Sequence, residues 1–273
     1  MSCRDSRSLD TFTCVKQKHM TMHLPESSLA IVLGLSALTM LNACSKEDAD
    51  PPATQPTPPA PVATTLAVTH NIDALPLTYD TIRYFNEVGN HYSVTRLEYY
   101  LSGLVLKGAD ATADHALAGP WYINGTWPNT FSLGTVPAGV YSGIEIDLGL
   151  PPALNQTNAL PNTMENVNMA WPIPMGGGYH FMKFEGHFMH QGQPTGFAMH
   201  LGKNQNLVHC VINQAFVVTD DQGSLTLQFN LNEVFSNPYM YDLAAGNQSM
   251  GSDSLMAVLR DNCTTAFLFE YQP

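Results

Sequence analysis

The feature that most constrains the fold of this chain is the alternation of apolar and polar residues in short segments rich in β-branched and aromatic side chains. A period of two residues places successive side chains on opposite faces of a sheet, so these segments predict half-buried strands. The segments lie at residues 66–72, 78–85, 92–106, 141–148 and 179–189.

The C-terminal part of the chain adds a hairpin and a helix to this pattern. Residues 215–219 and 224–231 predict two strands joined by the turn at 220–223, which reads Asp-Asp-Gln-Gly. Residues 254–261 are the only segment that predicts a helix. Many strands joined by short turns indicate an all-β domain, an antiparallel β-sandwich or barrel with one short C-terminal helix.

The N-terminal part of the chain predicts export and anchoring. The apolar run at residues 28–41 ends in Asn42-Ala43-Cys44, which is typical of a bacterial lipoprotein signal in which Cys44 becomes the lipidated first residue. A buried core helix with a chance cysteine is the alternative. Residues 51–62 are proline-rich and predict an extended tether.

These segments define the expected organisation of the chain. We expect a signal segment at 1–43, a tether at 44–64 and a β domain at 65–273. Lipidation at Cys44 places the protein at the cell envelope and joins it to a membrane, and Ser45 indicates the outer membrane, on its periplasmic or surface side.

The charge of the mature chain excludes one class of partner. Residues 1–43 hold four of the 11 basic and three of the 23 acidic residues, so the remainder has a net charge of −13. A polyanion of this size repels nucleic acid, and nucleic-acid binding is not expected.

Two cysteines remain after Cys44, namely Cys210 and Cys263. A single pair in an oxidising compartment predicts a disulfide bond. A thiolate metal site is the alternative.

Signatures of catalysis are missing from the sequence. It contains no G-x-S-x-G elbow, no H-E-x-x-H pair and no phosphate-binding glycine loop. Glu145 and Asp147 are two residues apart on a predicted strand, a spacing more typical of a solvated face than of a glycosidase carboxylate pair. We therefore do not expect an enzyme.

Histidine and methionine are the residues through which the mature chain could bind a metal. Eight histidines and nine methionines follow Cys44, and four of the histidines lie between residues 180 and 200. Imidazole suits copper and zinc, and thioether suits reduced copper. On one strand His187 and Met189 share a face while His180 and His190 share the other, so a metal site needs ligands from separate strands. Surface or hydrogen-bonded histidines are the alternative interpretation.

Several ordered motifs resemble one family. The segment at 94–106, VTRLEYYLSGLVL, resembles the tyrosine-rich strand of the MbnP-like proteins, exported copper-associated proteins related to the methanotroph surface protein CorA. Further similar motifs follow in the same order at residues 137–144, 148–150, 169–186 and 197–202.

The resemblance implies a single copper ion held by histidines of separate strands near a tryptophan, which a dihaem partner enzyme oxidises in some members. His70 and His200 match the family histidines, Trp171 matches the tryptophan, and His180 is an additional candidate ligand. Ile173 departs from the family's second aromatic. The expected function is copper binding or handling. The alternative is a metal-independent surface module for a peptide or glycan.

Overall fold

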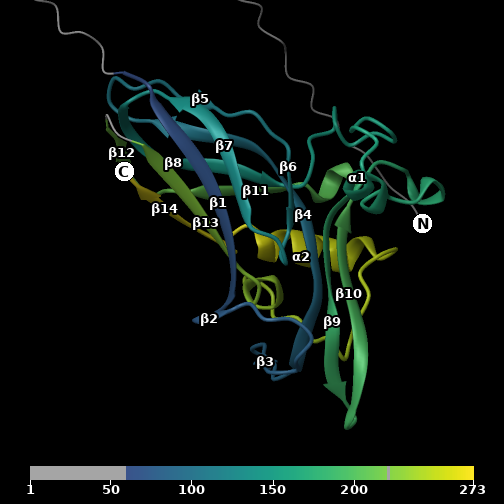
Figure 1. Ribbon diagram of the computed structural model, residues 1–273. Helices are drawn as coiled ribbons and strands as arrows, with labels where there is room; N and C mark the ends of the chain where they lie inside the picture. Colours follow the sequence, from purple (N-terminus) through teal and green to yellow (C-terminus); the bar gives the residue numbers. More distant parts are fainter. Residues whose placement is uncertain (1–59, 220–221) are drawn as a thin grey trace, which may run out of the picture. The chain divides into compact units, whose positions relative to one another are not determined.

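The computed structural model describes residues 60–219 and 222–273, which fold into two β-sheets with a few short helices (Figure 1). Cys44 and most of the predicted tether lie outside the described residues. The first strand begins at Val62, so the last residues assigned to the tether belong to the folded domain. No helix in the described ranges is both long enough and apolar enough to cross a membrane.

The smaller sheet has five strands in the order β14-β13-β1-β2, with β7 also paired to β1. Its pairs are antiparallel apart from β1 and β13, which run parallel. The strands of this sheet are β1 (Val62–Ile72), β2 (Leu75–Pro76), β7 (Asn129–Val136), β13 (Gly223–Asn230) and β14 (Phe267–Gln272).

The larger sheet has nine strands, and its main path is β10-β9-β4-β8-β11. The long strand β4 (His91–Gly108) also pairs with β3, β5 and β6, and β12 pairs with β8. The other strands are β3 (Tyr84–Phe85), β5 (His115–Ala116), β6 (Trp121–Asn124), β8 (Gly139–Leu148), β9 (His180–His190), β10 (Gln193–Gly202), β11 (Val208–Ile212) and β12 (Phe216–Val218).

Aromatic and aliphatic side chains of the two sheets meet in one core. Tyr99 of β4 lies edge-on to Phe229 of β13, with ring centroids 5.3 Å apart. Both rings are fully buried, and each such burial contributes about 1.5–3 kcal/mol. This contact fixes which face of β4 is the core-facing one.

The predicted all-β fold is confirmed, and so is the C-terminal helix, which is α2 (Asp253–Cys263). Ser252 caps its first turn through a hydrogen bond that its side chain accepts from Leu255 N. A second, shorter helix, α1 (Met164–Asn168), was not predicted, because five residues are too few to show a helical period. Three single-turn 3₁₀ helices lie at Ile173–Met175, Asn204–Asn206 and Glu233–Phe235.

Two predictions of local structure are wrong. The expected strand at 78–85 is regular only at Tyr84–Phe85, because the preceding residues contact β4 through the single bridge of Tyr79 with Val94. The expected hairpin of residues 215–231 does not form, because β12 pairs with β8 in the larger sheet and β13 pairs with β1 and β14 in the smaller one. The turn sequence therefore connects two sheets.

Candidate metal centre

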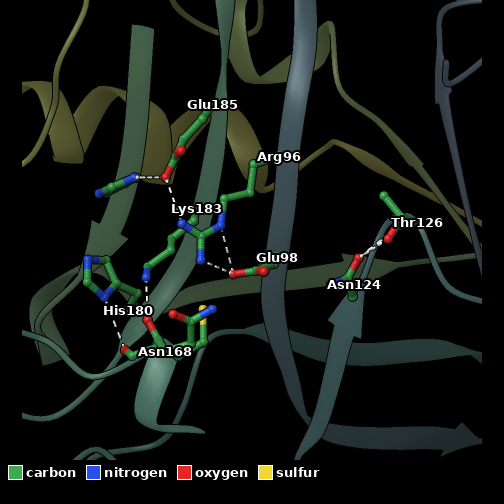
Figure 2. Close-up of polar contacts among 10 residues, drawn as sticks. Arg96, Glu98, Asn124, Thr126, Asn168, His180, Lys183 and Glu185 are labelled. Carbon is green, nitrogen blue, oxygen red and sulfur yellow. Dashed lines mark hydrogen bonds and ion pairs between the residues drawn. The ribbon is translucent and has the colours of Figure 1, made fainter. Parts of the chain in front are cut away.

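The candidate site lies on the face of the larger sheet that is opposite to the Tyr99 side. Register places Arg96 beside Glu185, and Lys183 between Glu98 and His200 on neighbouring strands. Since side chains alternate along a strand, these five residues point away from the face on which Leu97, Tyr99 and Met182 are buried. Figure 2 shows the polar side chains of β4 and β9 gathered at this place.

A bulge brings His180 into the same group. Met182 pairs with Leu201, but the next pair is His180 with Gly202, so that Phe181 is an extra residue on β9. One extra residue reverses the alternation of side chains beyond it. The rings of His180 and His200 consequently lie 5.0 Å apart, at an interplanar angle of 89°.

Trp171 forms the wall of this site. Its indole lies 4.6 Å from the ring of His180, is 1% exposed, and donates a hydrogen bond from Nε1 to the carbonyl of Met175 at 3.2 Å. Gly202 is required at the contact, since a Cβ atom there would lie 2.5 Å from the indole ring. The tryptophan and the two histidines thus form one packed cluster.

Each imidazole of the pair is held by a hydrogen bond at one nitrogen. His180 Nδ1 lies 3.1 Å from the carbonyl oxygen of Met169, which can only accept, so Nδ1 carries the proton and the lone pair is on Nε2. His200 Nε2 lies 2.9 Å from Glu185 Oε1, and in the neutral ring this leaves the lone pair on Nδ1. The Nδ1 atom of His200 is buried and has no hydrogen-bond partner within the described residues.

Charged neighbours orient this pair. Arg96 donates to Glu98 Oε2 from Nε at 3.0 Å and from Nη2 at 2.7 Å, and its Nη1 lies 3.4 Å from Glu185 Oε1 (Figure 2). The hydrogen bond from His200, followed by the charge of Arg96, lowers the pKa of Glu185, which keeps this carboxylate ionised. Lys183 donates from Nζ to the carbonyl of Asn168.

Burial sets the protonation of His180. Desolvation lowers the pKa of His180 to about 3, and the nearby charge of Lys183 acts in the same direction. The ring is therefore neutral at physiological pH, which is the form that ligates metals.

His70, the other predicted ligand, lies elsewhere. It follows Leu66 and Val68 on the core-facing side of β1, and its Nε2 is hydrogen-bonded to the hydroxyl of Tyr99 at 2.9 Å. Because Tyr99 is on the core-facing side of β4, His70 and His200 lie on opposite faces of the larger sheet. The structure therefore does not bring these two histidines together as expected, and the imidazole beside His200 is that of His180.

The cysteine prediction also needs correction, because Cys210 and Cys263 are free thiols in this structure. Cys210 Sγ donates a hydrogen bond to the carbonyl oxygen of Cys263 at 3.5 Å, and it is not bonded to the sulfur of Cys263. Burial raises the pKa of Cys210 to about 12 and that of Cys263 well above its usual range, which also disfavours a thiolate metal site.

The cluster presents two adjacent imidazoles as candidate metal ligands. Within residues 60–219 and 222–273, no three His, Cys, Asp or Glu side chains come together closely enough to hold a metal ion. Of the predicted site residues, the structure brings His180, His200 and Trp171 together. The contacts of Glu185 and Arg96 with this cluster were not predicted, although the cross-strand charge pairing of β4 with β9 was the available signal.

Comparison with known proteins gives one family and one structure. The family model described as MbnP matches residues 61–253. The solved structure of MbnP from Methylosinus trichosporium is 14% identical to this chain, covers 78% of it and 99% of its own length, and superimposes with a TM-score of 0.42. No curated protein matches the chain significantly.

Proposed function

The chain belongs to the MbnP family, and from this premise we propose that it binds one copper ion through His180 and His200, beside Trp171, and so holds or hands on copper at the cell envelope. Family membership itself suggests a copper-related role. The assignment of the ion to this cluster rests on His200 Nδ1, which is buried and has no hydrogen-bond partner within the described residues. Burying such an atom costs free energy unless a ligand binds to it.

The spacing of the two rings fits one shared ion. A metal–nitrogen bond of about 2.0 Å and the size of an imidazole place each ring centroid about 3 Å from the ion, so two rings on one ion are about 4–6 Å apart. The centroids of His180 and His200 are 5.0 Å apart.

The surroundings of the rings support the same proposal. A metal-bound histidine ordinarily donates its second nitrogen to a carboxylate or a backbone carbonyl, which fixes the tautomer. His200 has Glu185 in this role and His180 has the carbonyl of Met169. The two cationic side chains nearby, Arg96 and Lys183, are balanced by the carboxylates of Glu98 and Glu185.

Imidazole ligands favour copper or zinc over magnesium and calcium, and the family relationship selects copper between the first two. With two protein ligands, water completes the coordination of a cupric ion. Trp171 lies against His180, so a bound ion would be next to the residue that the family oxidises with a dihaem partner. The lipid anchor at Cys44, the partner and the oxidation of Trp171 remain predictions.

Metal analysis of the purified full chain tests the proposal. We expect about one equivalent of copper per chain, and a loss of affinity of more than about 100-fold in His200→Gln, which keeps a hydrogen-bonding group for Glu185 but lacks the imidazole. His209→Ala is the matched control, because His209 is an exposed histidine paired with Asp147 on a different strand. Unchanged copper binding in a folded His200→Gln protein would exclude this site.

A further inference from the structure

Two adjoining pockets form a groove beside α1, and we refer to them as the α1 groove. Their volumes are about 520 and 400 Å³, and Leu160, Pro161 and Asn166 line both. Asn166 stands between them, accepting a hydrogen bond from Tyr100 at 2.6 Å and donating one to the carbonyl of Pro161 at 2.8 Å. The two pockets therefore share one wall, in which two hydrogen bonds hold the side chain of Asn166 in place. Figure 1 shows α1 and β6 at the same end of the domain.

One half of the α1 groove is aromatic. Tyr122 lies between Tyr100 and Trp127, with ring centroids 5.8 and 6.0 Å away, respectively. The indole of Trp127 is 51% exposed although its backbone is fixed by a hydrogen bond from Asn129 Nδ2 to its carbonyl at 2.9 Å. An aromatic ring open to solvent in a pocket is a platform on which an apolar ligand face can stack.

The other half is lined by uncharged polar groups. Thr157, Asn158 and Asn162 line it together with the backbone of Gly178. A side-chain amide offers two donors and an acceptor in one plane, a pattern that suits neighbouring hydroxyl groups. Gly178 is held in place because its amide donates to Thr157 Oγ1 at 3.1 Å, so the floor of this half is fixed as well.

The groove carries little charge although the chain carries a net charge of −12. Glu165 is the one charged residue among those that line the two pockets. A ligand with formal charge finds no counter-ion there, whereas an uncharged ligand with an apolar face and a hydroxyl edge is matched by both halves. A polyproline peptide would match the aromatic half and would accept hydrogen bonds from the amides of Asn158 and Asn162, but proline has no N–H to donate to their amide oxygens.

We propose that the α1 groove binds a neutral oligosaccharide, whose sugar rings stack on Trp127 and Tyr122 and whose hydroxyl groups are hydrogen-bonded by Asn158 and Asn162. The two pockets are lined by residues other than His180, His200 and Trp171, so sugar binding does not require the proposed copper site. Tethering at Cys44 would then place a glycan-binding surface at the envelope, where polysaccharides are abundant.

Calorimetric titration of the purified full chain with cellohexaose, chitohexaose and maltohexaose tests the proposal. We expect at least one of these sugars to bind, with the affinity reduced at least about tenfold in Trp127→Ala and in Asn158→Ala/Asn162→Ala. Phe85→Ala is the control, because Phe85 is an aromatic residue of similar exposure, 58%, that lies on β3 outside both pockets and should leave binding unchanged. His200→Gln should also bind the sugar as the parent does, which separates this inference from the copper proposal.

Three results would overturn the inference. The first is that none of the three sugars binds at millimolar concentration. The second is that folded Trp127→Ala binds the sugar as tightly as the parent. The third is that a decaproline peptide binds in a Trp127-dependent manner while the sugars do not, which would assign the groove to polyproline recognition instead.

Discussion

His70 and the His180–His200 pair are histidines in different surroundings. His70 lies between the two sheets, and its Nε2 is satisfied by the hydroxyl of Tyr99. His200 lies on the opposite face of the larger sheet, where Glu185 satisfies one nitrogen and the other is buried with no partner among residues 60–219 and 222–273. Burial lowers the pKa of both His70 and His180, so a neutral ring does not separate the two environments. The two environments differ instead in the lone pair of His200 Nδ1, which is buried and has no hydrogen-bond partner among the described residues.

The largest expected difference between the two environments is in copper affinity. Replacing His180 by Ala should weaken copper binding by more than about 100-fold, because it removes one of two protein ligands. His70→Ala should change copper affinity by less than about twofold. Competition with a copper chelator measures both, and circular dichroism confirms that each variant is folded. Loss of copper binding in His70→Ala would show that His70 also contributes to the copper site.

The second expected effect is a pH dependence of stability that follows from the burial of His70. Burial lowers the pKa of His70 from 6.5 to about 4, so the unfolded chain binds a proton more readily than the folded one between these values. This contribution is absent above pH 6.5, and the free energy of unfolding falls as the pH drops toward 4. Allowing for the partial exposure of the ring, His70 should cost about 1–2 kcal/mol at pH 5 relative to pH 7.

Urea unfolding of the parent and of His70→Gln at pH 7 and pH 5 measures this effect. The amide of Gln does not titrate in this range and can still hydrogen-bond to Tyr99. The parent should therefore lose about 1–2 kcal/mol more than His70→Gln between the two pH values. An equal loss in both proteins would show that His70 does not titrate differently on folding.

The third prediction concerns Glu185 as a residue that positions His200. Glu185→Gln weakens the hydrogen bond to His200 Nε2 and the contact with Arg96, and should reduce copper affinity about tenfold. Glu145→Gln is the matched control, since Glu145 has a similar exposure and also pairs with one cation, Lys107 at 3.6 Å. Equal effects of the two substitutions would point to net charge as the cause.

The smallest expected effect is on the Tyr99 side. Tyr99→Phe removes the hydrogen bond to His70 from an otherwise unchanged core and should lower the free energy of unfolding by about 1 kcal/mol. Copper affinity should not change, because the hydroxyl is on the face of β4 away from the metal site. A parallel loss of copper would show that the two faces of the sheet are coupled.

The sequence was sufficient to predict most of the fold and only the composition of the site. Strands β4, β8 and β9 follow from their own alternation. The partner of β13 does not, because pairing with β1 depends on residues about 160 positions away and overrides the local turn signal at 220–223. Local patterns report which face of a strand is buried, but they do not report which strands become neighbours.

The same limit explains why the proposed ligand beside His200 is His180 and not His70. Strict alternation placed His180 and His187 on opposite faces and gave no reason to join His180 to His200. The bulge at Phe181 and Gly202 does so, and nothing in the segment around Phe181 marks it as an extra residue. Family resemblance then favoured His70. Its hydrogen bond to the Tyr99 hydroxyl forms only when β1 and β4 pack against each other, so neither strand's sequence alone could reveal it.

The burial of Cys210 and Cys263 has a consequence for the chemistry of a bound redox metal. Thiolates reduce cupric ions and are themselves oxidised, but the thiol form reacts far more slowly than the thiolate. Both sulfur atoms are inaccessible in the folded domain, and burial raises the pKa of both. Within the described residues, neither thiol is therefore available to reduce a cupric ion at the surface. Only unfolding would expose the two sulfurs, and a copper ion bound as proposed would then oxidise the chain that carries it.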